Sequence, residues 1–210
     1  MMLNLKAIYP GPNTSARNHA EMVYPYLLKD LEINYFNQVW QTDISYIRVG
    51  NGFMYLTGII DVYSRKVLSY RVSSCLGGES CVDALEDAIS KYGLPEIINS
   101  DQGSQYTSQL WVKRVKDLNI KISMTGKGRC NDNAYIERFW RTAKYEWLKL
   151  RFIPTAAKLK NELANFMEWY NNQRPHQSIG YQTPDEKAYG FMDKFYNLPT
   201  IPQAQQQQII

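Results

Sequence analysis

Residues 40–47 read WQTDISYI and residues 53–63 read FMYLTGIIDVY, with VGNG at positions 49–52 between them. Both runs are rich in β-branched and aromatic residues, which favour strands, and Gly-Asn-Gly is a strong signal for a hairpin turn. The sequence therefore predicts two neighbouring antiparallel strands. Asp43 stands in the middle of the first strand, although a buried carboxylate is costly unless it is paired or binds a metal ion.

The residues after this hairpin predict the rest of an α/β domain. We expect strands at residues 66–74, 96–101 and 121–125, and helices at residues 78–92, 108–118, 133–151 and 155–172. The first helix should end before Gly93, and Ser108 should cap the second. Three strands in a meander, followed by strands that alternate with helices, predict a five-stranded mixed sheet with helices on both faces.

The spacing of hydrophobic residues also predicts the buried face of each later helix. For residues 108–118 this face is Leu110, Val112 and Val115. For residues 155–172 it is Leu159, Leu163, Phe166 and Tyr170. For residues 133–151 it is Ile136, Phe139, Trp140, Ala143, Trp147 and Leu150, with Glu137, Arg141 and Lys144 on a neighbouring polar stripe.

The sequence positions of two further acidic residues suggest that they lie close to Asp43 in the folded protein. Asp101 ends a buried run, and Glu137 lies on an amphipathic helix, with thirty-five residues between the two. If the first strand pairs in parallel with the fourth, Asp43 and Asp101 lie side by side at the sheet edge where ligands gather. Two unit charges about 4 Å apart repel by roughly 4 kcal/mol at an effective dielectric near 20, so three converging carboxylates need a divalent cation. The trio predicts metal-assisted phosphoryl transfer, and three unrelated surface acids are the alternative.

Composition and charge narrow the class of protein. A chain of 210 residues, 44% of them hydrophobic, suffices for one domain with a substantial core. Its three cysteines lack CxxC spacing, and no apolar run or leader suggests a membrane span or secretion, so we expect a cytoplasmic protein without a zinc site. Residues 108–175 contain 14 Lys and Arg against 6 Asp and Glu. This basic half suits a polyanionic partner, with a solvated charged surface as the alternative.

The acid trio and its spacing resemble the catalytic core that retroviral integrases share with many bacterial insertion-sequence transposases. Three stretches match the bacterial proteins: WQTDISY at 40–46, DQGSQY at 101–106 and DNAYIE at 132–137. A terminal signature of those transposases is matched by YN at 170–171, RPH at 174–176 and GYQTP at 180–184. The likeness covers about residues 25–188, and the motifs together are highly specific.

This resemblance implies a ribonuclease-H-like fold, two Mg²⁺ or Mn²⁺ ions as cofactors, and DNA strand transfer as the activity. Asp43, Asp101 and Glu137 are then the catalytic residues and metal ligands, with Asp43 shared between the ions. The expected reaction exposes a 3′-hydroxyl at the end of the element, and that hydroxyl then attacks target DNA. The expected partners are DNA and further copies of the chain on it, at the nucleoid in the cytoplasm.

Several residues near the trio are candidates for DNA contacts. Lys144, seven residues after Glu137, occupies a position where the family carries a basic residue, and a solvated charge is the alternative. Arg138 stands where relatives usually carry a small hydroxyl residue. Arg141 is a further candidate. Gln102 and Ser104 are candidates that a plain turn could also explain, and Asn133 is one for which helix capping is the expected role. Arg174 and His176 either brace their loop or touch DNA.

Two other groups of residues have structural explanations. We expect Asp61, ahead of Ser64 and Arg65, to accept structural hydrogen bonds. We expect the tryptophans to be core or dimer contacts, namely Trp111, Trp140, Trp147 and Trp169.

The organisation of the chain leaves two other functions open. Relatives carry helix-turn-helix segments upstream, so we interpret residues 1–37 as a linker or remnant of an upstream DNA-binding region, residues 38–175 as the core, and residues 176–210 as an extension with a disordered Gln-rich end. A truncated frame, a fusion to an upstream frame and a separately encoded helix-turn-helix partner are all compatible with this division. The alternatives to a transposase are a catalytically silent DNA-binding or dimerisation module and a structure-specific nuclease.

Overall fold

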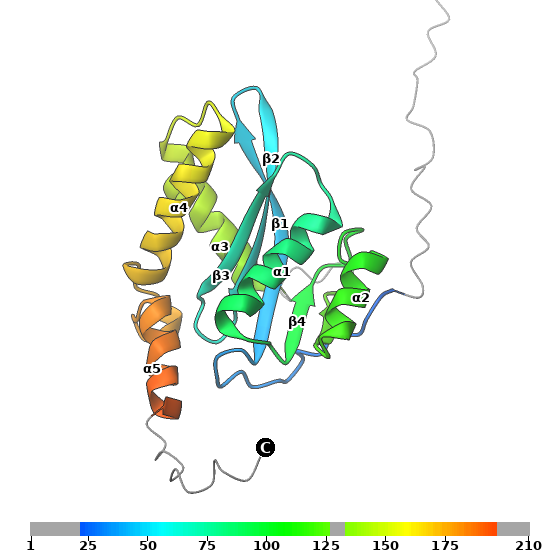
Figure 1. The fold of residues 1–210 in the computed structure, drawn as a ribbon. Coiled ribbons are helices and arrows are strands. Elements are labelled where there is room, and N and C mark those ends of the chain that lie inside the picture. Colours follow the sequence, from blue (N-terminus) through cyan, green and yellow to red (C-terminus); the bar gives the residue numbers. More distant parts are fainter. Residues whose placement is uncertain (1–21, 127–132, 197–210) are drawn as a thin grey trace, which may run out of the picture.

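The computed structural model describes residues 22–126 and 133–196. Most of the predicted linker and the whole Gln-rich end lie outside these residues. The strands are β1 (Val39–Val49), β2 (Gly52–Asp61), β3 (Val67–Ser73), β4 (Ile97–Ser100) and β5 (Lys121–Met124). The α-helices are α1 (Gly78–Tyr92), α2 (Gln109–Asp117), α3 (Ala134–Arg141), α4 (Ala156–Asn172) and α5 (Pro184–Tyr196) (Figure 1).

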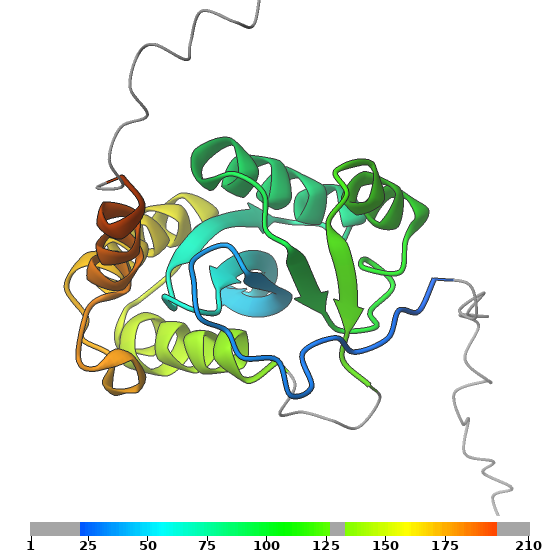
Figure 2. The same ribbon diagram turned by 90° about the horizontal axis from the view of Figure 1, so that it is seen from below.

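The five strands form one mixed sheet in the order β3-β2-β1-β4-β5. β1 pairs antiparallel with β2 and parallel with β4, and β4 pairs parallel with β5. Helices α1 and α2 cover one face of the sheet, and α3 and α4 cover the other (Figures 1 and 2). The predicted five-stranded mixed sheet with helices on both faces is confirmed.

Alternating side chains of the strands build a core on each face. Ile59 of β2 belongs to the cluster under α1 and α2, whereas its neighbour Ile60 belongs to the cluster under α3 and α4. This alternation follows from the pleat of a strand, which sends successive side chains to opposite faces. Trp40 in the first cluster and Phe166 in the second are both fully buried.

The long helix predicted at residues 133–151 is wrong in its second half. After α3 the chain continues as a π-helical segment, Thr142–Trp147, and a 3-10 turn, Leu148–Leu150. A π-helix bonds residue i to i+5, so it takes more residues per turn than an α-helix and shifts the buried face. Leu150 is therefore 75% exposed, and Leu148 takes its place in the core.

The buried face predicted for α2 is also partly wrong. Leu110 is 50% exposed, and Trp111 is buried in its place beside Val112 and Val115. Trp111 and Val115 are four residues apart and share a helix face, whereas Leu110 is not three or four residues from either valine. The cap at Ser108 is confirmed, because its hydroxyl accepts a hydrogen bond from the backbone N–H of Trp111 at 3.3 Å.

Segments on both sides of the predicted core pack against it. Residues 22–38 form no helix or strand, but their hydrophobic side chains pack against a buried cluster where β1 and β4 begin. These side chains are Leu28, Leu31 and Ile33, and the cluster is Val39, Val62 and Ile97. Helix α5, which was not among the predicted elements, follows a 3-10 turn at Gln177–Ile179 and packs next to α4. Its Ala188 is buried, and its Asp185 forms an ion pair with Lys66. Among the described residues, no helix is long and apolar enough to cross a bilayer.

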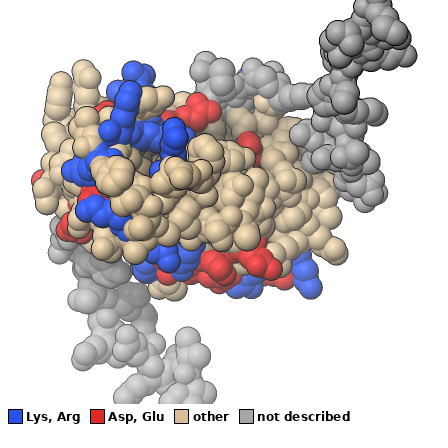
Figure 3. Space-filling model, turned by 90° about the horizontal axis from the view of Figure 1, so that it is seen from above, with Lys and Arg blue, Asp and Glu red and all other residues tan. Residues whose placement is uncertain are grey.

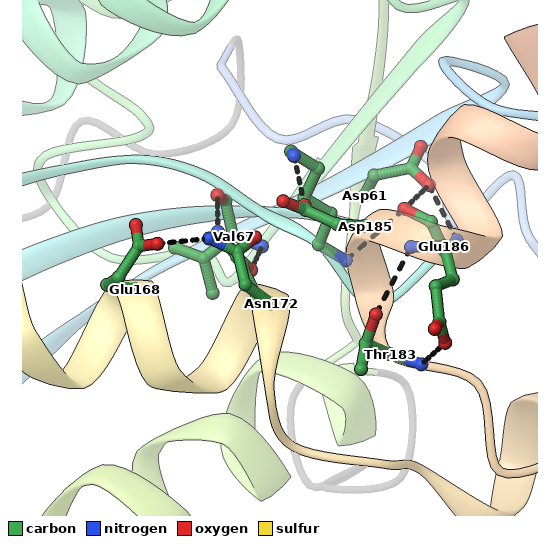
Figure 4. Close-up of polar contacts among 10 residues, drawn as sticks. Asp61, Val67, Glu168, Asn172, Thr183, Asp185 and Glu186 are labelled. Atoms are coloured by element: carbon green, nitrogen blue, oxygen red, sulfur yellow. Dashed lines mark hydrogen bonds and ion pairs between the residues drawn. The ribbon is translucent and has the colours of Figure 1, made fainter.

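Two side chains tie the end of α4 and the β2–β3 turn to their surroundings. Asn171 pairs with the backbone of Val67, since its Oδ1 accepts from the N–H and its Nδ2 donates to the carbonyl, both at 2.9 Å. Asp61 Oδ2 accepts from the N–H and hydroxyl of Ser64 at 2.7 Å, and its Oδ1 accepts from the N–H of Asn37. The structural role expected for Asp61 is therefore confirmed, and Figure 4 shows this region.

We predict that Asn171→Ala lowers the free energy of unfolding by about 1–3 kcal/mol, because it leaves the N–H and carbonyl of Val67 without partners at a partly buried position. Urea denaturation followed by circular dichroism measures the change. Asn172→Ala is the matched control, since Asn172 is exposed and, among the described residues, its side chain bonds to Glu168 on its own helix (Figure 4). Equal stability of the two variants would contradict the prediction.

Candidate functional site

The parallel pairing of β1 with β4 brings Asp43 and Asp101 to the same edge of the sheet. The register pairs Trp40 with Ile98 and Gln41 with Asn99. Continued by two residues, the same register places Asp43 level with Asp101, which directly follows β4. Asp43 is half-buried and Asp101 is exposed. The sequence prediction that strand pairing sets these two carboxylates side by side is borne out by this register.

A tryptophan on α3 holds the carboxylate of Asp43. Trp140 Nε1 donates a hydrogen bond to Asp43 Oδ2 at 2.9 Å. Its ring reaches across β2 at Gly58, which is the antiparallel partner of Asp43. A methyl group at position 58 would lie 2.7 Å from Cη2 of Trp140, so only glycine leaves room for the ring.

The loop after β4 orients Asp101. Gly103 N–H donates to Asp101 Oδ1 at 2.8 Å and closes an Asx-type turn. A Cβ atom at position 103 would lie 2.8 Å from that same oxygen, so any larger residue would displace the Asp101 carboxylate from this position. The loop is anchored by the buried Tyr106, whose hydroxyl lies 3.1 Å from Thr42 Oγ1, next to Asp43 in β1.

Glu137 lies in the first turn of α3 and is exposed. Its helix is fixed to β1 on either side of it: Ile136 N–H donates to Gln41 Oε1 at 3.3 Å, and Trp140 bonds to Asp43. Within residues 22–126 and 133–190, no three His, Cys, Asp or Glu side chains lie close enough together to hold one metal ion. The convergence of all three carboxylates on shared ions therefore stays a prediction.

The electrostatics of the pair favour a cation. Burial, followed by the charge of Asp101, raises the pKa of Asp43 to about 6, while the Trp140 hydrogen bond opposes this shift and Glu137 adds to it. A carboxylate whose charged form is disfavoured by burial and by a neighbouring carboxylate is stabilised by a nearby positive ion. Carboxylate oxygens are the ligands that Mg²⁺ and Mn²⁺ prefer, so the donor set fits the implied cofactors.

Basic residues flank this acidic pair. Lys144 is half-buried, and burial lowers its pKa while the charge of Asp43 raises it. It lines a groove of about 490 Å³ together with Tyr46, Arg48, Lys149 and Phe152, among others. Arg138 and Arg141 are exposed on α3, and Lys and Arg gather over one side of the face seen in Figure 3. Gln102 is half-buried and Ser104 is exposed in the loop after Asp101.

The structure corrects the role expected for Asn133. Asn133 occupies the N-cap position of α3, but its side chain makes no capping hydrogen bond. It is buried, and its Oδ1 accepts from Asn99 Nδ2 at 3.3 Å. The side chain thus joins α3 to β4 instead of capping the helix, and its expected contact with DNA stays a prediction.

Arg174 and His176 brace the loop that follows α4. Arg174 forms an ion pair with Glu146 at 3.2 Å, and the His176 ring packs edge-on against Tyr170. Burial, followed by the neighbouring guanidinium groups, lowers the pKa of His176 to about 4. Of the tryptophans expected in the core, Trp111 and Trp140 are buried, and Trp147 and Trp169 are half-buried and packed against each other.

Sequence reasoning missed three residues that shape the site: Trp140 as a hydrogen-bond donor, Gly58 and Tyr106. Trp140 was assigned to the packing face, which is correct for its ring but not for its Nε1. The register of β1 with β2 was the available signal for Gly58, because a glycine within a strand indicates close approach by another group.

We predict that Gly58→Ala lowers the free energy of unfolding by about 1–3 kcal/mol, because the added methyl displaces Trp140 from Asp43. Thermal unfolding and near-UV circular dichroism of the tryptophans measure the change. Gly52→Ala, on the same strand with no atom closer than 4.0 Å to the new methyl, is the matched control and should be nearly neutral. A Gly58→Ala protein as stable as this control would refute the packing argument.

We predict that Asp43→Asn stabilises the metal-free protein near neutral pH by about 1–2 kcal/mol. The folded chain keeps the Asp43 proton up to about pH 6, whereas its ordinary pKa is 3.8, so the free energy of unfolding falls as pH rises through this window. Urea denaturation in EDTA should show the variant more stable at about pH 8 and the difference shrinking towards about pH 4.

Asp83→Asn, at an exposed position on α1, is the control for a change of one charge. It should show no comparable gain. An Asp43→Asn protein that is less stable than wild type at high pH would show that the carboxylate is favourably paired in the metal-free fold.

Comparison with known proteins gives consistent matches. Two family models described as integrase core domain match residues 35–130 and 118–184. The transposase for insertion sequence element IS904 of Lactococcus lactis is 34% identical over 155 residues, covering 71% of this chain and 60% of that protein. Transposase InsF for insertion sequence IS3A of Escherichia coli is 31% identical over 188 residues, covering 88% of this chain and 65% of that protein. The chain thus spans less than two thirds of these relatives.

Solved structures show the same fold. The HTLV-2 integrase catalytic core domain in complex with magnesium aligns with a TM-score of 0.61 and 21% identity, covering 73% of this chain and 97% of that one. A chain of the simian T-cell lymphotropic virus intasome in complex with PP2A regulatory subunit B56 gamma aligns with a TM-score of 0.67 and 22% identity, covering 84% and 61%. The predicted ribonuclease-H-like fold is confirmed by these neighbours.

Proposed function

Because the chain belongs to the integrase core domain family and is a relative of bacterial insertion-sequence transposases, we propose that it catalyses metal-dependent cleavage and strand transfer at the ends of an insertion sequence. The observation that carries this proposal is the side-by-side placement of Asp43 and Asp101 at the end of the β1–β4 pair. Burial and the charge of Asp101 raise the pKa of Asp43, and within the described residues no basic side chain forms an ion pair with Asp43 or Asp101.

Asp43, Asp101 and Glu137 are the residues that would hold two Mg²⁺ or Mn²⁺ ions, with Asp43 shared between them. When bound, such ions stabilise the attacking and leaving oxygens of an in-line phosphoryl transfer. The chain orients its own carboxylates for this chemistry, because Trp140 fixes Oδ2 of Asp43 and Gly103 fixes Oδ1 of Asp101. Glu137 completes the set from α3, which two hydrogen bonds hold against β1.

The surroundings of the acids suit a DNA substrate. Lys144 lies near Asp43 and lines the groove that also contains Arg48, Lys149 and Arg151, and no acidic residue of the described chain lines it. Such a groove favours a phosphate backbone through charge. We propose DNA ends and target DNA as substrates, several copies of the chain assembled on them, and an upstream helix-turn-helix product as the part that recognises specific ends. The nucleoid in the cytoplasm is the corresponding location.

We predict that Asp43→Asn, Asp101→Asn and Glu137→Gln each reduce strand transfer by at least about 100-fold, because each removes a charge that acts on the transition state. The assay joins labelled element ends to plasmid DNA in Mg²⁺ or Mn²⁺, with the full-length partner product present. Glu168→Gln, an exposed carboxylate on α4 outside the site, is the matched control and should retain activity.

Three outcomes separate the candidate functions. A folded wild type that binds DNA but neither cuts nor joins it in either metal ion would identify a catalytically silent module. Cutting without joining would identify a nuclease. Joining that survives the three substitutions would show that these carboxylates do not form the active site.

A further inference from the structure

A second pocket lies apart from the acidic pair, between the β2–β3 turn, α3 and the terminal signature at residues 170–184. Its volume is about 590 Å³. It is lined by aromatic rings and by three arginines, one from each of these segments, and no carboxylate of the described chain lines it. The lining residues that carry the argument are Arg65, Arg138, Arg174, Tyr135, His176 and Tyr181.

The terminal signature builds one wall of this pocket. Asn171 ties the end of α4 to β3, and His176 forms an isolated bridge with Gln182. Between them the chain turns sharply, with left-handed backbone at Gly180 (φ +70°) and Tyr181 (φ +61°). This turn leaves Tyr181 at the rim, 68% exposed.

Arg65 is held rigidly in the opposite wall. Its backbone is left-handed (φ +66°) at the end of the turn that Asp61 and Ser64 fix. Its guanidinium lies 3.7 Å from the centre of the Tyr135 ring. Its Nε is fully buried without a hydrogen-bond partner, and it forms no ion pair within the described residues. The charge of Asp61 stabilises this guanidinium in part, but its unpaired buried Nε donor is costly.

The other two arginines complete a concentration of positive charge. Arg138 is exposed on α3 and has no ion pair among the described residues, whereas Arg174 is paired with Glu146. Burial, followed by the charges of all three guanidinium groups, lowers the pKa of His176 against the opposing charge of Glu146, so the ring is neutral near pH 7. Like charges this close together repel one another, and an anion bound between them would offset this repulsion.

Packing alone explains the aromatic rings and Asn171, but it does not explain three convergent guanidinium groups. A guanidinium presents paired N–H donors that match the oxygens of a phosphate, and its charge is permanent. Arg138 is the neighbour of Glu137 on α3, so the same helix presents a carboxylate towards the acidic pair and a guanidinium towards this pocket. A strand that crosses α3 can therefore meet both.

We propose that the pocket formed by Arg65, Arg138 and Arg174 binds a backbone phosphate of DNA outside the acidic site, and so holds the strand against α3. This inference rests on the proposed function in one respect, namely that DNA is the substrate. Tyr135 and Tyr181 at the rim contact the sugar-phosphate chain, and the terminal signature serves to place Arg174 and close the pocket.

The test measures DNA binding in EDTA, without catalysis. Fluorescence anisotropy with a labelled random-sequence duplex gives the Kd for wild type, Arg65→Gln, Arg138→Gln and the matched control Lys113→Gln, an exposed position on α2 across the sheet. We expect Arg65→Gln and Arg138→Gln each to raise Kd about tenfold and to reduce the slope of log K against log salt by about 0.9. Lys113→Gln should change neither comparably.

Because Arg65 lies in a constrained turn, its variant is checked by thermal unfolding, and the exposed Arg138 keeps the test valid if Arg65→Gln fails to fold. Pocket variants that bind DNA like the control overturn the proposal. The proposal is also overturned if the pocket variants bind DNA normally but self-associate less in sedimentation velocity. That result would indicate that the pocket binds a carboxylate of another copy of the chain. A wild type that joins no DNA ends, while Arg138→Gln still loses affinity, would leave the pocket established and remove the proposed function.

Discussion

The parallel pairing of β1 with β4 is the constraint on which the site depends. It is short, running from Val39 and Ile97 to Gln41 and Asn99, yet it fixes where Asp43 and Asp101 stand. Trp40 and Ile98, paired within it, are fully buried and hold the register through the core under α1 and α2. A slip of one residue would send every side chain to the other face, so the hydrophobic core itself keeps the carboxylates together.

Helix α3 couples the second half of the chain to that pair. Ile136 and Trp140 bond to Gln41 and Asp43 of β1, and both side chains are also buried against β2 and α4. Glu137 stands between these two anchors, so its distance from Asp43 depends on α3 staying seated. The π-helical segment that follows turns Leu148 rather than Leu150 into the core and allows α4 to pack closely.

The sequence predicted the parts of the fold that depend on local pattern. The bounds of α1 and the hairpin between β1 and β2 follow from periodicity and from glycine at the turns. The π-helical shift could not be predicted, because the hydrophobic spacing of residues 133–151 fits a continuous α-helix and the pattern carries no signal for i+5 bonding. The same holds for Trp140, whose ring signals burial in any sequence, while its bond to Asp43 requires the register of two strands.

The contacts of the terminal signature, residues 170–184, suggest what these residues do. Asn171 bonds to Val67, and Asp185, just after the signature, pairs with Lys66, so both attach it to the β3 end of the β2–β3 connection that presents Arg65. A signature that served stability alone would neutralise the arginines it encloses, as Glu146 does for Arg174. Arg65 and Arg138 form no ion pair within the described residues, although the charge of Asp61 acts on Arg65. Two of the three arginines therefore lie without an ion pair near the acidic residues, and a DNA backbone phosphate is the ligand we propose for them because its charge complements theirs.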